Sequence, residues 1–349
     1  MLKNWVPMPG CLGWTIISCV VLALFVSAAP RSQAIESRQA TETPVLWRDP
    51  APLETKDLYW GPGSPNKAPK PPFFFVKEDR SGTKPKIQVT DANGMLWTAK
   101  FASKSRTGTE VHAEIAASRL MWALGYFVEE HYFVSDGVIT GVHSLRRRTS
   151  DVLAPNGSFR AARFERRPPG ISRGGRWDLD NNSFAGSREL SGLKILAMLV
   201  NNWDARLGNT GILRVPIRAD EVEARHILSD LGTAFGRMAH AGGKGTRWNL
   251  AHYQHGAFIR GIEDDTLVFC HGLDAAPQLS VPVEHARWVS ALASQLNPAQ
   301  VRRAFEAAGA KPDDIDGFST VVMRRVAQLR AVLDGHQVRA GCLEEEEPQ

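Results

Sequence analysis

The chain has 349 residues, of which 43% are hydrophobic and 23% are charged, with 30 glycines and 21 prolines. These values are ordinary for a globular protein, so they exclude a collagen, a multi-span membrane protein and a chain disordered over most of its length. The formal net charge of +5 is too small to indicate nucleic acid as a specific partner.

The N-terminus has the pattern of an export signal. Lys3 precedes an apolar run over residues 12–26, and small residues follow before a candidate cleavage site at Ser32–Ala34. We therefore expect residues 1–34 to be a signal peptide that exports the chain to the periplasm or the exterior. Because about 15 apolar residues are few for a membrane span, the second interpretation is an uncleaved anchor through residues 12–26 at a bacterial envelope membrane.

Composition and periodicity divide the residues that follow. Residues 35–72 are rich in proline and polar side chains, which predicts a linker with little regular structure. From residue 73 to residue 145 the pattern predicts strands, one helix and further strands. A strand at Met95–Phe101 places alternate side chains on opposite faces, and the amphipathic helix predicted over Val111–Leu124 ends at Gly125.

Residues 146–182 are predicted to be a basic, loop-like stretch. A solvated surface is one interpretation, and a docking site for phosphate, a membrane or an acidic substrate is the other. The nine arginines of this stretch are Arg146, Arg147, Arg148, Arg160, Arg163, Arg166, Arg167, Arg173 and Arg176.

The remainder of the chain is predicted to be mostly helical. A strong apolar period predicts a helix over residues 187–201, and two long amphipathic segments occupy residues 284–308 and 313–334. The acidic tail at 341–349 is predicted to be disordered.

Cysteine and histidine give no metal-binding pattern. No zinc-type Cys/His spacing occurs, and His252 and His255 are better explained as surface residues. Beyond the N-terminal segment only Cys270 and Cys342 remain. They could form one disulfide in an oxidising compartment, but their separation in sequence leaves the pairing open.

Five polar side chains lie on the elements that a phosphoryl-transfer site requires. Lys100 lies on a predicted strand, Glu114 on the following helix, and Asp204 and Asn209 in a polar loop after a long apolar helix. Asp230 follows the short strand predicted at residues 225–228. Transfer from a nucleotide needs a cation on the phosphates, a carboxylate to hold that cation, a base for the acceptor hydroxyl, and oxygen ligands for magnesium.

This pattern resembles the protein-kinase-like superfamily of the atypical kind, and is similar to HipA-type bacterial kinases and phosphatidylinositol 3-/4-kinases. The resemblance covers roughly residues 73–240. It implies an α+β, bilobal protein-kinase-like fold, with a small strand-rich N-lobe over 73–145 and a larger, mainly helical C-lobe over 146–340. The matching segments are WTAK with Lys100, EIAASRLMWALG with Glu114, NNWDARLGN with Asp204 and Asn209, and ILSDLGTAFG with Asp230.

The resemblance also implies a role for each of the five residues. Lys100 would contact the phosphates of ATP, and Glu114 would hold Lys100 in place. Asp204 would be the catalytic base, while Asn209 and Asp230 would ligate Mg²⁺ or Mn²⁺. Nucleotide and an unidentified acceptor substrate are the expected partners.

Three features depart from this pattern or compete with it. Asn202–Trp203 stands where many kinases have His-Arg, and Gly82 is the only glycine of the first strand-connecting turn, so no Gly-x-Gly-x-x-Gly loop is present. Glu110 competes with Glu114 for Lys100, although its position three residues after Thr107 fits a capping box.

Two functions of different classes follow. The first is an ATP- and Mg²⁺-dependent phosphotransferase that acts on a hydroxyl of a protein, lipid or small molecule; transfer of AMP instead of phosphate is a variant of it. The second is a non-catalytic exported or envelope-anchored binding protein that retains a kinase-like fold and uses its arginine-rich stretch for contact. All five side-chain types are retained, which favours the enzyme.

Overall fold

The computed structural model describes residues 40–81, 84–102, 109–146, 152–238, 245–256, 258–273, 279–335 and 342. The predicted signal peptide at 1–34 and the acidic tail, apart from Cys342, lie outside these residues. Across the part of the chain that the structure describes, no helix has both the length and the apolar character needed to cross a membrane.

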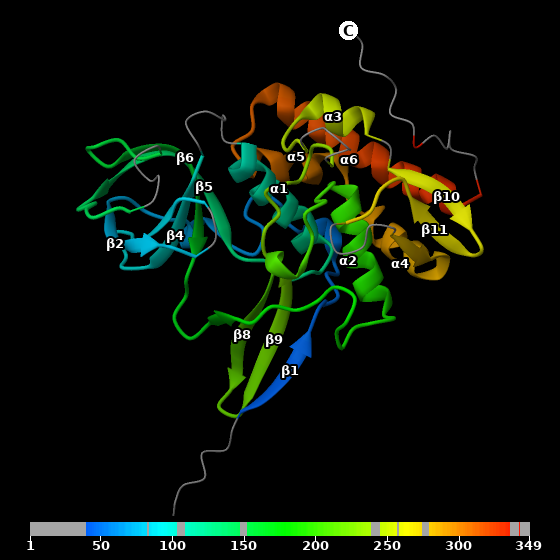
Figure 1. Cartoon of the computed structure of the whole chain (residues 1–349), viewed down its shortest axis with the longest axis horizontal. Coiled ribbons are helices and arrows are strands. Elements are labelled where there is room, and N and C mark those ends of the chain that lie inside the picture. Colours follow the sequence, from blue (N-terminus) through cyan, green and yellow to red (C-terminus); the bar gives the residue numbers. More distant parts are fainter. Residues whose placement is uncertain are drawn as a thin grey trace, which may run out of the picture. The chain divides into compact units, whose positions relative to one another are not determined.

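Six α-helices and several sheets make up the described residues, so the fold is a mixture of α and β structure (Figure 1). The strands are β1 Thr41–Val45, β2 Phe73–Asp79, β3 Lys86–Thr90, β4 Leu96–Phe101, β5 His131–Thr140, β6 Ser158–Arg166, β7 Ser172–Gly174, β8 Thr210–Arg218, β9 Glu221–Leu228, β10 Ile259–Glu263, β11 Thr266–Phe269 and β12 Ser280–Pro282. The α-helices are α1 Thr109–Ala123, α2 Arg188–Leu199, α3 Leu250–His255, α4 Val283–Ala293, α5 Pro298–Ala307 and α6 Pro312–Leu333, and 3₁₀ turns occur at Leu53–Thr55, Pro65–Lys67 and Leu207–Asn209.

Five strands close into a barrel in the order β2-β3-β4-β6-β5. All neighbours are antiparallel except β2 and β5, which pair in parallel over two residues. Alternation along β4 turns Trp97 and Ala99 into the barrel, where both are fully buried with Phe164 of β6. The alternate residues of β4, including Lys100, therefore face out of the barrel.

A second hydrophobic core lies among the helices. Helix α1 contacts β5 and β6 of the barrel as well as α5, α2 packs against α4, and α6 packs against α4 and α5. Helix α1 ends where the sequence predicted, because Gly125 adopts a positive φ of +92° and a Cβ there would lie 2.3 Å from the carbonyl oxygen of Arg48. The chain thus has two separate cores, with α1 next to both.

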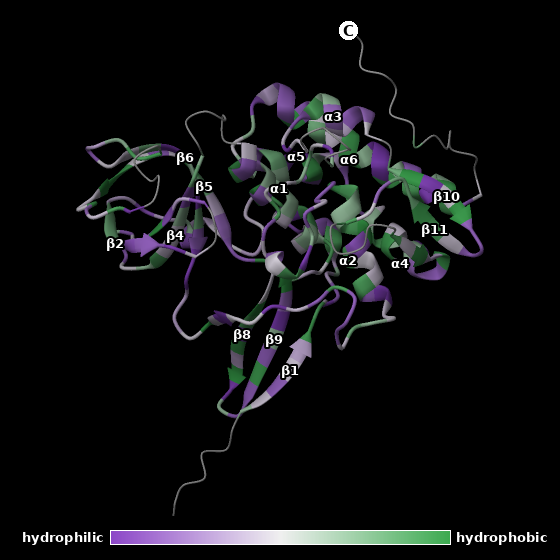
Figure 2. Cartoon of the chain, in the orientation of Figure 1, coloured by the Kyte–Doolittle hydropathy of each residue, from purple (hydrophilic) through white to green (hydrophobic). Residues whose placement is uncertain are grey.

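A four-stranded sheet in the order β1-β9-β8-β7 contains β8, which follows the polar loop, and β9, which precedes Asp230. The antiparallel pair β8–β9 begins with Thr210 opposite Leu228, so the start of β8 and the end of β9 lie side by side. Hydrophobic and hydrophilic residues alternate along these two ribbons (Figure 2). The pairing brings the loop before β8 next to the loop after β9, although they are about 20 residues apart in sequence.

The prediction of a linker over 35–72 is wrong for its described part, residues 40–72. Strand β1 pairs in parallel with β9, and Leu46, Leu53 and Leu58 are buried in the helical core. The side-chain amide of Gln300 on α5 donates to the carbonyl oxygen of Leu53 at 2.9 Å. Leucines spaced irregularly between prolines have no helical or strand period, so their burial was not visible in the pattern.

The boundary between strand-rich and helical parts also lies elsewhere than predicted. Strand β6 at Ser158–Arg166 completes the barrel, so the barrel extends beyond residue 145 and the stretch 146–182 is not simply a loop. The C-terminal part contains the small sheet β10-β11-β12 in addition to its helices. Residues 284–308 form two helices, separated where Asn297 caps α5.

Cys270 and Cys342 form a disulfide, with their Cα atoms 5.1 Å apart. The bond joins residues 72 positions apart in sequence and ties Cys342 to the residue that follows β11. This settles the pairing that the sequence left open.

Replacing a buried leucine of the predicted linker tests whether residues 40–72 belong to the folded core. Leu58→Ala removes a side chain that is 0% exposed, so we expect it to lower the free energy of unfolding by about 3 kcal/mol in denaturant titration. Leu207→Ala, at a leucine 47% exposed, is the matched control and changes it by less than about 0.5 kcal/mol. If both substitutions had equally small effects, residues 40–72 would not be part of the folded core, and the prediction of a linker would stand.

Candidate active site

Strand β4 and helix α1 bring Lys100 and Glu114 into an ion pair. Lys100 Nζ lies 3.2 Å from Glu114 Oε2, and the two residues are 7% and 1% exposed. Lys100 leaves the barrel on the face opposite Trp97 and Ala99, and Glu114 reaches it from the second turn of α1. Isolated charges are costly to bury, so each of these groups requires the other.

Glu114 binds a second buried cation, which the sequence analysis did not assign to the site. Arg163 on β6 lies directly opposite Lys100 on β4, and its guanidinium donates to Glu114 Oε1. Arg163 also donates to Glu165 at 3.3 Å, and it lies 2.8 Å from His131 Nε2. Each oxygen of Glu114 thus has its own cation, which fixes the carboxylate beside Lys100.

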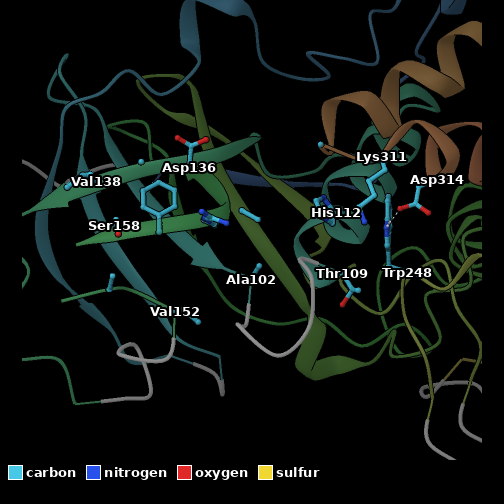
Figure 3. A pocket seen from close by; sticks show the side chains of 17 residues that line it. Ala102, Thr109, His112, Asp136, Val138, Val152, Ser158, Trp248, Lys311 and Asp314 are labelled. Carbon is cyan, nitrogen blue, oxygen red and sulfur yellow. Dashed lines mark hydrogen bonds between the residues drawn. The ribbon is translucent and has the colours of Figure 1, made fainter. Parts of the chain in front are cut away.

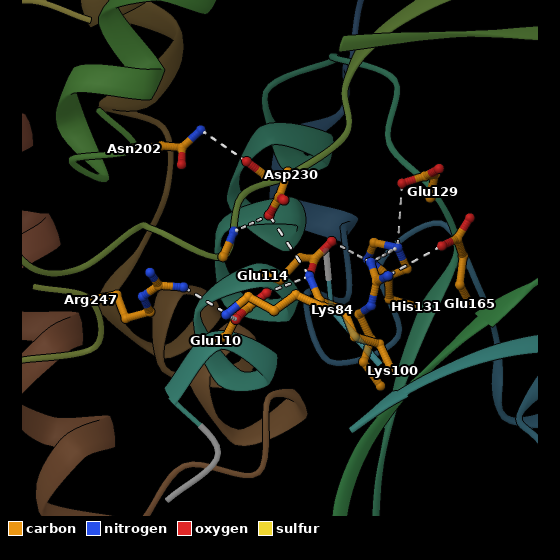
Figure 4. A network of polar contacts seen from close by, with 12 residues as sticks. Lys84, Lys100, Glu110, Glu114, Glu129, His131, Glu165, Asn202, Asp230 and Arg247 are labelled. Atoms are coloured by element: carbon orange, nitrogen blue, oxygen red, sulfur yellow. Dashed lines mark hydrogen bonds and ion pairs between the residues drawn. The ribbon is translucent and has the colours of Figure 1, made fainter. Parts of the chain in front are cut away.

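Glu110, the competitor named above, makes the closer contact with Lys100. Its Oε1 lies 2.6 Å from Lys100 Nζ, and its Oε2 lies 3.0 Å from Lys84 and 3.2 Å from Arg247 (Figure 4). Thr107, the other half of the expected capping box, lies outside the described residues. Glu110 is therefore part of the site rather than only a helix-capping residue.

The neighbouring charges favour the ionised forms of Lys100 and Glu110, whereas burial raises the pKa of Glu114 to about 7 despite its contacts with Arg163 and Lys100. Burial alone would lower the pKa of Lys100, but the carboxylates of Glu114, Asp230 and Glu110 outweigh it and raise the pKa, so the amine stays charged. Burial alone would raise the pKa of Glu110, but Lys100 and Lys84 lower it to about 2. Both groups are ionised at neutral pH.

Asp230 lies where β9 ends, on the open side of the cluster. Its Oδ1 is 3.9 Å from Lys100 Nζ, and its side chain is 41% exposed. The main-chain N–H of Gly232 donates to the same oxygen at 3.3 Å. A Cβ at Gly232 would lie 2.6 Å from Glu110 Cγ, so α1 and this turn approach each other at a residue without a side chain.

The loop between α2 and β8 is tied to the turn that holds Asp230. Asn202, fully buried, donates to the Asp230 carbonyl at 3.4 Å and accepts from Thr233 Oγ1 at 2.6 Å. At the other end of the loop, the carbonyl of Asn209 accepts from the N–H of Ser229 at 2.9 Å. Asn202 is a further residue whose role the sequence did not reveal, since its position with Trp203 only departs from the His-Arg of many kinases.

Asp204 and Asn209 are joined across this loop. The side-chain amide of Asn209 donates to the Asp204 carbonyl at 2.7 Å, and the Asp204 carboxylate pairs with Arg206 Nε at 2.9 Å. The Asp204 side chain is 19% exposed. The structure thus joins Lys100, Glu114 and Asp230 through direct contacts, and links Asp204 and Asn209 to Asp230 through the main chain.

Two side chains of these loops have oxygen atoms of the kind that a divalent cation prefers. Because the amide nitrogen of Asn209 is engaged with Asp204, the group that Asn209 can offer a cation is its side-chain oxygen. The accessible carboxylate of Asp230 is of the same hard oxygen type, which Mg²⁺ prefers.

A second group of candidate metal ligands is an ion-pair network instead. Glu129, His131 and Glu165 are buried with their ligand atoms within 4.8 Å of one another. However, Arg163 contacts both His131 and Glu165, and Arg173 lies 2.9 Å from Glu129. Guanidinium groups therefore occupy the positions that a cation would need.

The same network accounts for much of the arginine-rich stretch. Arg163 is buried, Arg166 pairs with Glu130, and Arg167 and Arg173 pair with Glu165 and Glu129. These four arginines are matched by carboxylates, which contradicts a free basic surface over this part of the stretch. Arg147 and Arg148 lie outside the described residues.

A cavity of about 1000 Å³ lies on the other flank of α1 (Figure 3). Thr109 and His112 of α1, Trp248 and Lys311 line one side of it, and strands β5 and β6 line the other. None of the five predicted site residues lines this cavity. It shares with the site the first turns of α1 and the segment that carries Arg247 and Trp248.

Comparisons with known proteins give weak similarities. No family model matches the chain, and no curated protein matches it. Among solved structures it is similar to the Helicobacter pylori proinflammatory kinase CtkA, with 12% identity and a TM-score of 0.45 over 76% of this chain and 98% of that one. It is also similar to the Golgi casein kinase, with 13% identity and a TM-score of 0.38 over 79% of this chain and 76% of that one.

A second structure of the Golgi casein kinase, with Mn and ADP bound, gives 12% identity and a TM-score of 0.38 over 80% of this chain and 81% of that one. The structures named here are all kinases. At these TM-scores the likeness is too low to decide the fold or the activity of this chain, so both depend on the geometry of its own site.

The pH dependence of stability tests the ion pairs of Glu110 with Lys84, Lys100 and Arg247. Its folded-state pKa of about 2 lies below the ordinary value, so the ionised carboxylate stabilises the fold above about pH 4.5, and this contribution is lost as the pH falls toward 2. We expect Glu110→Gln to lower the free energy of unfolding by on the order of 2 kcal/mol at pH 6, and the difference from the wild type to shrink below pH 4.5.

Denaturant titrations at a series of pH values measure this difference. Glu42→Gln is the control, because the exposed pair of Glu42 with Arg214 contributes less than about 1 kcal/mol. A Glu110→Gln effect that stays constant from pH 6 to pH 3 would contradict the ion pairs of Glu110.

Proposed function

We propose that the chain is an ATP- and Mg²⁺-dependent phosphotransferase with a bilobal, atypical protein-kinase-like fold. The observation that carries this proposal is the convergence of four separate elements on one cluster. Lys100 of β4 pairs with Glu114 of α1 and lies 3.9 Å from Asp230, and the loop of Asp204 and Asn209 is bonded to the turn of Asp230. The separate barrel and helical cores support the two-lobed arrangement.

Each residue of the cluster has a role that its surroundings suit. Lys100, charged and held by Glu114, binds the donor phosphates, and Asn209 and Asp230 supply oxygen ligands for the metal ion. That ion would neutralise charge on the phosphates. Asp204 accepts the proton of the acceptor hydroxyl. The oxygen of that hydroxyl forms a bond to the γ-phosphorus, while the bond from the γ-phosphorus to the oxygen that bridges it to the β-phosphorus breaks, and ADP leaves.

The compartment is part of the proposal. Residues 1–34 would export the chain or anchor it at the bacterial envelope, and the Cys270–Cys342 disulfide supports an oxidising environment. ATP is scarce outside the cytoplasm, so an exported enzyme requires a local supply of nucleotide. An uncleaved anchor with the domain on the cytoplasmic side would remove that requirement but would leave the disulfide in a reducing compartment.

Removing the proposed base separates catalysis from binding. We expect Asp204→Asn to lower the rate of ADP formation from Mg-ATP at least 100-fold in the full chain, because general-base catalysis contributes about 10²–10⁴ in rate. Stabilisation of the fold by Mg-ATP should remain, since Asp204 does not bind the phosphates.

The matched control is Asp180→Asn, which breaks another aspartate–cation pair, with Lys194 at 2.6 Å, without touching the cluster. It should leave the rate unchanged. Equal rates for Asp204→Asn and Asp180→Asn would show that Asp204 is not the catalytic base. If the wild type formed no ADP with any divalent metal ion, the second function, a non-catalytic binding protein, would be favoured.

A further inference from the structure

One carboxylate in the site is surrounded by three cations from three distant parts of the chain. Glu110 contacts Lys84 ahead of β3, Lys100 on β4, and Arg247 after β9, at 3.0, 2.6 and 3.2 Å (Figure 4). Glu114 is matched by the buried Arg163, so it does not neutralise this group alone. Lys100 also has Glu114 at 3.2 Å and Asp230 at 3.9 Å, whereas Lys84 and Arg247 share the carboxylate of Glu110, so these two cations favour an anionic ligand at this point.

The connection between β2 and β3 supplies Lys84. A glycine-rich turn binds phosphates through main-chain N–H groups, but here Pro85, which has no N–H, follows Lys84 directly. The Lys84 side chain is 50% exposed, so its amine can turn from Glu110 to a ligand. Lys84 thus offers a side-chain cation from this connection.

The position of Arg247 is fixed by the main chain on both sides. The N–H of Thr246 donates to the Arg237 carbonyl at 2.9 Å, and the N–H of Trp248 donates to the Ala234 carbonyl at 3.1 Å. The two segments approach closely at Gly236, where a Cβ would lie 2.1 Å from the Thr246 carbonyl oxygen. Arg247 is thus held beside the turn of Asp230.

We propose that Lys84, Lys100 and Arg247 together bind the phosphoryl groups of the donor, with Glu110 as the counter-ion that holds them in its absence. This inference rests on the proposed function and adds Lys84 and Arg247 to the residues that bind the donor. Lys100 and Arg247 contact different oxygens of the Glu110 carboxylate, at 2.6 and 3.2 Å (Figure 4), so the oxygens of a phosphoryl group can replace that carboxylate between them.

Titration calorimetry of the full chain with Mg-ATP, Mg-ADP and metal-free tripolyphosphate tests this site. We expect Lys84→Met and Arg247→Met to raise the Kd for Mg-ATP and for tripolyphosphate about tenfold each, because each removes one charge-assisted contact. Arg247→Lys keeps the charge and should recover part of the loss.

Arg302→Met is the control for net charge. It removes a surface cation that pairs with Asp316, and it should leave all three Kd values unchanged. Unfolding curves of each variant establish that the fold is retained, and Arg247→Lys replaces Arg247→Met in the comparison if the latter does not fold.

The outcomes distinguish this inference from the proposed function. If the wild type binds Mg-ATP, and Lys84→Met and Arg247→Met bind it with the same Kd as the wild type, the inference is overturned. The proposed phosphotransferase function would not be affected by that result. Binding of tripolyphosphate that depends on Lys84 and Arg247, without binding of Mg-ATP, supports the phosphoryl site and overturns the phosphotransferase. No binding of either ligand by the wild type overturns both.

Discussion

The burial of Lys100 is the constraint on which the rest of the site depends. An amine that is 7% exposed is stable only beside carboxylates, and here it has Glu114, Glu110 and Asp230 around it. Pairing of β4 with β6 places Arg163 next to Lys100, so that Glu114 is held from two sides. The closed barrel and the packing of α1 against it thus hold Lys100, Arg163 and Glu114 in contact with one another.

The same arrangement joins the barrel to the sheet that carries the polar loop. Lys100 and Glu110 belong to β4 and α1, whereas Asp230 and Arg247 follow β9. The pair of Arg247 with Glu110 crosses this junction at 3.2 Å with both side chains largely buried, whereas Asp230 is 41% exposed and lies 3.9 Å from Lys100. Glu110 is central to the junction, since its partners come from the β2–β3 connection, from β4 and from the segment that follows Asp230.

Local pattern was enough to predict the elements that carry the first site residues. Alternation along Met95–Phe101 placed Lys100 away from the barrel interior, and helical period with Gly125 predicted α1 closely. Ser187 caps α2, which ends just before the polar loop. These features depend on residues within a few positions of one another, which is the range over which sequence pattern is informative.

Features that depend on distant partners were not predictable in this way. Strand β6 places Arg163 opposite Lys100 on the outer face and Phe164 opposite Ala99 inside the barrel, so the run of arginines alone indicated a surface loop. Glu110 had a complete local explanation as a capping residue, while its partner Arg247 lies 137 positions away. The leucines of residues 40–72 likewise find their contacts in helices near the C-terminus.

The central claim is that the cluster of Lys100, Glu114 and Asp230 binds a nucleotide with a divalent ion. Thermal unfolding of the full chain with and without Mg-ATP, beside Asp230→Asn, tests it most directly. A ligand at a hundredfold excess over its Kd stabilises the native state by about 2.7 kcal/mol. The account predicts a magnesium-dependent rise in Tm for the wild type that Asp230→Asn loses, and an unchanged Tm of the folded wild type at millimolar Mg-ATP would contradict it.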